Sequence, residues 1–138
     1  MCSDPPTGDL SLDQCWSLLR HSSSGRLALS ARALPVILPV QHYVDGRTIV
    51  MCIGSNPPFD PVVHDVVAAF AVESIDPVAA TGWTVHVQGL IRRPDQPGRA
   101  RRCPVGAGLI LGMEPEVVTG WRVKLCPAGS LDPWAALN

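Results

Sequence analysis

The side chains best suited to binding chemistry form a cluster of five arginines in the second half of the chain. Residues 92–102 hold one acid, Asp95, and five cations: Arg92, Arg93, Arg99, Arg101 and Arg102. A guanidinium donates several hydrogen bonds in a geometry that matches a phosphate, so the cluster could bind a phosphorylated ligand. No aromatic residue that would stack on nucleic-acid bases lies among these arginines. We favour a solvated loop over a phosphate site here, and rank nucleic acid below both.

The cysteines and histidines are dispersed along the chain and form no metal-binding pattern. The histidines lie at positions 21, 42, 64 and 86, and the five cysteines are Cys2, Cys15, Cys52, Cys103 and Cys126. Zinc sites need tighter ligand spacing, so the sequence predicts no metal. An odd number of cysteines without a signal peptide predicts a reducing compartment, mostly buried thiols and a cytoplasmic location.

Length and composition indicate one globular domain. The chain has 138 residues, of which 46% are hydrophobic, and a net charge of −1. That charge favours neither nucleic acid nor a membrane surface as a partner. No apolar run approaches the roughly 20 residues that a membrane-spanning helix needs.

A helix is expected near the N-terminus and a short second one near the middle of the chain. Ser11 and Gln14 have the spacing of a capping box, and an apolar stripe follows at positions 12, 15, 16 and 19. Asp60 and Pro61 are typical of a helix start, which predicts a short helix over roughly 60–65. Residues 1–10 are expected to form a flexible arm, 94–108 a surface loop and 126–138 a tail.

The remaining segments predict short antiparallel strands. Strands are expected over 26–30, 35–43 and 47–53, the last two joined by a turn at Asp45-Gly46. The apolar run 66–72 predicts a central strand buried on both faces, and 74–81 is expected to be a loop. Residues 82–91 form the clearest strand, and 109–111 and 117–125 are expected to complete the sheet on either side of 114–116. Such a pattern is typical of a barrel or sandwich.

Six short motifs occur in order along the predicted strands: GRLA at 25–28, PVILPV at 35–40, YVDG at 43–46, VAAFAV at 67–72, GWTV at 82–85 and EVVTGWRV at 116–123. Their order and spacing resemble the pyridoxamine 5′-phosphate oxidase-like family of flavin-binding split β-barrels, which are common in actinobacteria. The resemblance extends over roughly residues 10–125. It implies a mainly β fold over residues 11–125: a six- to seven-stranded antiparallel split β-barrel with an N-terminal helix and one short helix.

The resemblance also implies a homodimer that holds FMN or the deazaflavin F420 in a groove between its subunits. Hydride transfer to a small acceptor would need no catalytic triad, because the flavin carries the chemistry. The residues expected to line the cofactor site are Pro39, Val40, Gln41, Met51, Cys52, Ile53, Trp83, Gln88, Arg92 and Arg93.

The sequence departs from the family where the flavin phosphate is usually bound. Family members carry an Arg-Thr pair at the end of the third strand and a nearby Lys, whereas this chain has Cys52, Ile53 and Pro58. Arg47 or the Arg92-Arg93 pair could supply the missing charge. Alternatively, the groove holds another ligand or none, and the chain is a cofactor-free dimer that acts as a binding or stress-associated accessory protein.

Overall fold

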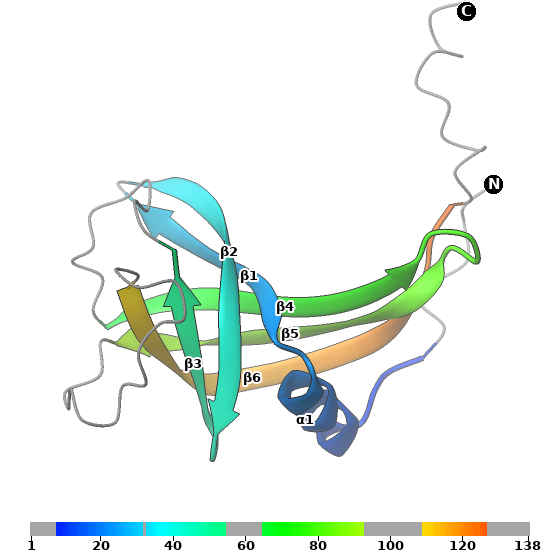
Figure 1. The fold of residues 1–138 in the computed structure, drawn as a ribbon, viewed down its shortest axis with the longest axis horizontal. Helices are drawn as coiled ribbons and strands as arrows, with labels where there is room; N and C mark the ends of the chain where they lie inside the picture. The colour runs from blue at the N-terminus through cyan, green and yellow to red at the C-terminus, as the bar shows by residue number, and fades with distance from the viewer. Residues whose placement is uncertain (1–7, 32, 55–64, 93–108, 127–138) are drawn as a thin grey trace, which may run out of the picture.

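A computed structural model describes residues 8–31, 33–54, 65–92 and 109–126. This part of the chain contains one helix and six strands (Figure 1). The helix α1 covers Leu12–His21, and the strands are β1 Ser24–Ala31, β2 Leu34–Asp45, β3 Thr48–Ile53, β4 Val66–Asp76, β5 Thr81–Arg92 and β6 Leu109–Lys124.

The six strands form one closed antiparallel barrel in the order β1-β2-β3-β6-β5-β4. Pairing of β1 with β4, for example Leu27 with Phe70, closes the barrel. Pairing of β3 with β6 brings Cys52 opposite Ile110. The predicted mainly β barrel with an N-terminal helix is therefore confirmed. The predicted helix over 60–65 lies outside the described residues apart from Asp65, a bend before β4.

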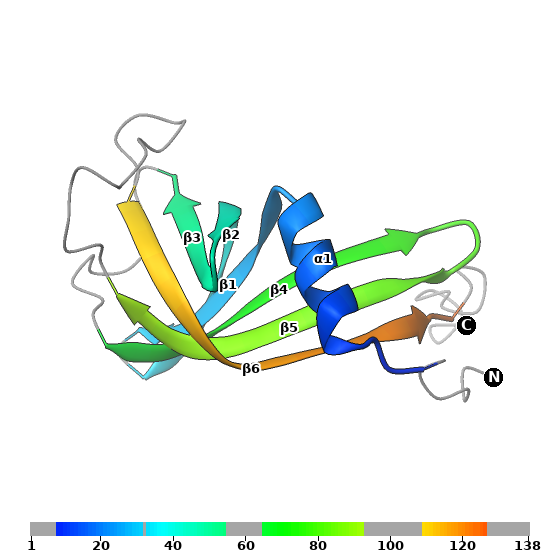
Figure 2. The same ribbon diagram turned by 90° about the horizontal axis from the view of Figure 1, so that it is seen from below.

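The helix α1 begins at the predicted capping box. The Gln14 amide donates to the Ser11 hydroxyl at 3.1 Å, and the Gln14 side chain accepts from the Ser11 amide at 2.8 Å. Three stripe residues are buried, Cys15, Trp16 and Leu19. The helix packs against β2, β5 and β6, so that α1 lies across the sheet at one end of the barrel (Figure 2). The sequence thus placed both the start of the helix and most of its buried face.

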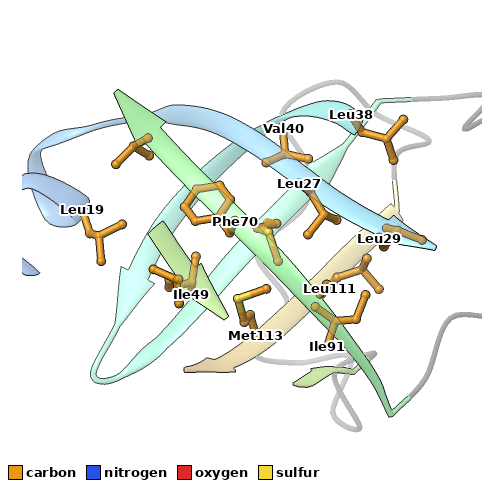
Figure 3. Packing of buried hydrophobic residues seen from close by; sticks show 14 of the residues in the cluster. Leu19, Leu27, Leu29, Leu38, Val40, Ile49, Phe70, Ile91, Leu111 and Met113 are labelled. Carbon is orange, nitrogen blue, oxygen red and sulfur yellow. The ribbon is translucent and has the colours of Figure 1, made fainter. Parts of the chain in front are cut away.

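The barrel interior is filled by alternate residues of all six strands (Figure 3). The largest buried side chains include Leu27, Ile49, Phe70, Ile91, Leu111 and Met113. Strand β4 follows the same alternation, and the side chain of Val67 is 64% exposed. The prediction that this strand is buried on both faces was wrong, because a barrel strand shows one face to the core and the other outward.

Strand β6 is continuous where two strands were expected. Its register with β5 shifts at a β-bulge: Gln88 pairs with Val117 and Gly89 pairs with Pro115, leaving Glu116 as the extra residue. A bulge is one of the few places where a strand tolerates proline. Gly89 is required there, because a Cβ on it would collide with the carbonyl group of Glu114.

Strands β4, β5 and β6 continue beyond the barrel as a three-stranded ribbon (Figures 1 and 2). The loop expected over 74–81 is shorter than predicted: β4 runs to Asp76 and β5 starts at Thr81, so only residues 77–80 form the turn. The end of the predicted N-terminal arm pairs with β6. The Leu10 amide donates to the Gly120 carbonyl and the Arg122 amide to the Gly8 carbonyl, each at 2.9 Å. No helix in the described ranges is long and apolar enough to cross a membrane.

Candidate functional site

A groove of about 730 Å³ lies on the outer face of the barrel, over β1, β2, the end of β3 and the middle of β4. Its lining comprises Ser24, Gly25, Arg26, Ile37, Pro39, Val40, Gln41, Cys52, Gly54, Ala71 and Glu73. We call it the β1–β2 groove. Its volume lies within the range of about 300–1,000 Å³ that is common for small-molecule sites.

Strand register brings the lining residues together. Gln41 pairs with Ser24 on one side and with Cys52 on the other, which forms one row across three strands. Arg26 pairs with Pro39 and with Ala71, which forms a second row. Side chains two residues apart on a strand share a face, so the two rows lie side by side in the groove. The site is built from pairings between segments far apart in the chain.

The groove combines an apolar surface with polar and charged side chains. Ile37, Pro39 and Ala71 provide an apolar surface, and the hydroxyl and amide groups of Ser24 and Gln41 can hydrogen-bond to the edge of a ring. Arg26 and Glu73 contribute one charge of each sign.

Four of the predicted site residues line this groove: Pro39, Val40, Gln41 and Cys52. Met51 and Ile53 point instead into the core, where they are 0% and 3% exposed. Met51 and Ile53 flank Cys52 on β3. Successive side chains of a strand point to opposite faces, so the neighbours of the outward-facing Cys52 point into the core. Arg93 and Pro58 lie outside the described residues.

Trp83 and Gln88 lie in two other hollows. Trp83 borders a hollow of about 480 Å³ between α1 and the ends of β5 and β6. Gln88 borders one of about 540 Å³ on the outer face, next to Ile37 and Val67. Ile37 also lines the β1–β2 groove, so this second outer hollow is adjacent to the groove.

Arg92 is not among the lining residues of the β1–β2 groove. Its Nε lies 2.6 Å from a carboxylate oxygen of Asp65, and Nη1 lies 3.7 Å from Glu114. These two acids balance the charge of Arg92 at the barrel end where β4 begins. The remaining predicted cations, at 99, 101 and 102, lie outside the described residues.

Comparisons with known proteins agree with this architecture. The family model described as pyridoxamine 5′-phosphate oxidase matches residues 11–106. The uncharacterized protein Rv0080 of Mycobacterium tuberculosis is 33% identical, with 83% of this chain and 84% of that protein covered. The chain belongs to the pyridoxamine 5′-phosphate oxidase family.

Solved structures share the fold at lower sequence identity. The FAD binding protein from Mycobacterium smegmatis has a TM-score of 0.67 at 21% identity, with 85% of this chain and 98% of that chain covered. A conserved protein of unknown function from Corynebacterium diphtheriae has a TM-score of 0.69 at 19% identity, with 88% of this chain and 100% of that chain covered. The resemblance inferred from the sequence motifs is thus confirmed.

The end of β3, where the sequence resemblance implies the flavin phosphate, offers no cation in this chain. Cys52 is half-buried and disulfide-bonded, and Ile53 is buried in the core. Cys126 is also disulfide-bonded, whereas Cys15 is a free, buried thiol whose pKa is raised by burial. The expectation of mostly buried thiols was therefore wrong for Cys52 and Cys126. The described residues include no cluster of His, Cys, Asp and Glu that could hold a metal.

Sequence reasoning missed three polar lining residues of the groove, Ser24, Arg26 and Glu73. Arg26 forms no ion pair with any residue that the structure describes. The sequence did single out the region of Arg26, because this residue belongs to the segment 25–28, one of the motifs on which the family resemblance rests. That segment was used only to identify a strand, and its pairing with Pro39 is what brings Arg26 to the groove.

Proposed function

We propose that this chain binds a flavin cofactor, FMN or the deazaflavin F420, in the β1–β2 groove. We further propose that it acts as an oxidoreductase on a small acceptor. The observation that carries the proposal is the groove itself, which combines apolar and polar lining residues in a chain of a flavin-binding family. The fold neighbour from M. smegmatis is an FAD binding protein, which supports a flavin in general.

Each part of the groove has a role in this proposal. Ile37, Pro39 and Ala71 would contact the faces of the ring, and Gln41 would hydrogen-bond to its polar edge. The bound flavin would supply the hydride chemistry. The protein would orient the ring and exclude water from one of its faces.

We also propose a homodimer that uses the apolar surface beside the groove. Ile37, Val67 and Val117 are 65%, 64% and 47% exposed, and Ala28 and Ala69 lie among them. We call this surface the outer apolar patch. Because Ile37 belongs to both the patch and the groove, a second copy docked on the patch would border the cofactor.

Titration of the purified protein tests the flavin proposal. Flavin fluorescence is followed as FMN, FAD or F420 is mixed with the protein, and the visible spectrum is recorded first. We expect binding at or below tens of micromolar. Ala71→Trp should abolish it by filling the groove, whereas the matched control Val78→Trp, at a turn residue that is 93% exposed, should bind normally. A colourless protein that binds none of the three would refute the proposal.

A second candidate function is a cofactor-free dimer that acts as a binding or stress-associated accessory protein. The observation in its favour is the end of β3, where Cys52 and Ile53 offer no cation. Under this alternative the titration shows no binding, while sedimentation still shows a dimer. The two measurements together separate the candidates.

A further inference from the structure

The end of β3 offers no residue that could bind an anion in the groove. Cys52 carries no positive charge and its sulfur is already in a disulfide. Ile53 is 3% exposed and apolar. A phosphate needs fixed donors and positive charge, which neither residue supplies.

Arg26 is the one cation among the described residues that line the β1–β2 groove. It is exposed on β1 between Pro39 of β2 and Ala71 of β4, which places it in the middle of the groove floor. No described residue neutralises it, in contrast to Arg92, which is paired with Asp65 at 2.6 Å. Ser24 lies two residues earlier on the same strand and also lines the groove, so a hydroxyl donor is near the guanidinium.

We propose that Arg26 recognises the phosphate of the flavin side chain, with Ser24 as a second donor. This inference rests on the proposed flavin-binding function and names the residue that replaces the family's usual phosphate ligands. Glu73 on β4 also lines the groove, and its negative charge opposes an anion beside it. The phosphate is therefore expected over β1 and β2, away from β4.

Comparison of FMN with riboflavin tests this role, because riboflavin lacks only the phosphate. Dissociation constants for both are measured by fluorescence titration with the wild type, Arg26→Gln and Arg26→Lys. We expect Arg26→Gln to weaken FMN binding about tenfold or more and to change riboflavin binding less than about twofold. The FMN dissociation constant of Arg26→Lys should fall between those of the wild type and Arg26→Gln, because lysine keeps the positive charge but cannot form the bidentate hydrogen bonds of a guanidinium. If the wild type binds F420 in place of FMN, F420 and its phosphate-free deazaflavin are compared in the same way.

Arg122→Gln is the matched control, since Arg122 is an exposed arginine of the same barrel that lines the hollow beside α1. It should leave both dissociation constants unchanged, and thermal melts should show that all variants are folded. Equal losses of FMN and riboflavin in Arg26→Gln would overturn the inference, and so would a larger FMN loss in Arg47→Gln. In both cases the wild type still binds flavin, whereas failure of the flavin proposal would appear as a wild type that binds neither compound.

Discussion

His42 is a buried base whose surroundings favour its neutral form. It is 7% exposed and its ring packs edge-on against Phe70, with 4.9 Å between the ring centroids. Its Nε2–H donates to the carbonyl oxygen of Leu19 at 3.0 Å, near the C-terminus of α1. Nδ1 has no hydrogen-bond partner among the described residues. Burial lowers the pKa of His42, and the hydrogen bond to Leu19 only partly opposes that shift.

This lowered pKa predicts that acid destabilises the protein through His42. The unfolded chain takes up the proton near pH 6.5, the ordinary pKa of histidine, while the folded chain resists protonation until a lower pH. The free energy of unfolding should therefore be constant above about pH 6.5 and fall as the pH drops below it. Urea unfolding of the wild type between pH 5 and 8 measures this slope.

His42→Gln should remove most of that slope, because glutamine does not titrate. His86→Gln is the matched control, since His86 is exposed on β5, and it should keep the wild-type slope. The same pH dependence in His42→Gln and the wild type would show that other groups cause it.

The outward orientation of a side chain can be predicted where its position along a strand is enough. Pro39 and Gln41 were expected at the site and line the groove, because both alternate with the buried Leu38 and Val40 on β2. Arg26 was missed because its part in the groove depends on pairing with β2 and β4, and a single sequence does not show that register. Their roles in cofactor binding remain predictions.

At the scale of elements, the bulge between β5 and β6 requires glycine at position 89. A Cβ on Gly89 would collide with the Glu114 backbone, which is fixed by pairing on both sides of the bulge. We expect Gly89→Ala to lower the free energy of unfolding by about 2 kcal/mol or more, because backbone cannot move aside as a flexible side chain can. Urea denaturation measures the change.

Gly112 of β6 is the control for this substitution. A Cβ there would meet its nearest atoms at 3.6 and 3.8 Å, which are ordinary contacts. Gly112→Ala should change stability by less than about 1 kcal/mol. Equal effects at the two glycines would show that the bulge backbone can adjust.

Local signals located most elements but not the length of the longest strands. The capping box placed α1, and the turn at Asp45-Gly46 placed β2 and β3 correctly. The break expected at 114–116 was wrong because Pro115 stops a strand only when no bulge accommodates it. Whether a bulge forms depends on the partner strand β5, which lies some 25 residues away in sequence.

At the scale of the whole molecule, the outer apolar patch predicts self-association. Exposed clusters of large apolar side chains usually mark an interface. We expect Val67→Glu to shift the protein from dimer to monomer, because an unpaired carboxylate in an apolar interface costs several kcal/mol. Analytical ultracentrifugation at micromolar concentration measures the mass.

Val78→Glu places the same charge on the turn between β4 and β5, where Val78 is 93% exposed. This control should leave the mass unchanged. A wild type that sediments as a monomer would refute the dimer, and a dimer that persists in Val67→Glu would place the interface on another surface.

The ribbon that extends from the barrel also has a consequence for solubility. Strand β6 pairs with β3 only over residues 109–113, so its remaining backbone on that side is an open edge in the described part of the chain. An open edge can recruit a strand from another molecule and begin aggregation. Here Gly8 and Leu10 occupy part of that edge through hydrogen bonds to Arg122 and Gly120, and Glu114, Glu116 and Lys124 place charges along the rest. The first residues of the described chain thus leave less of this edge open to a strand from another molecule.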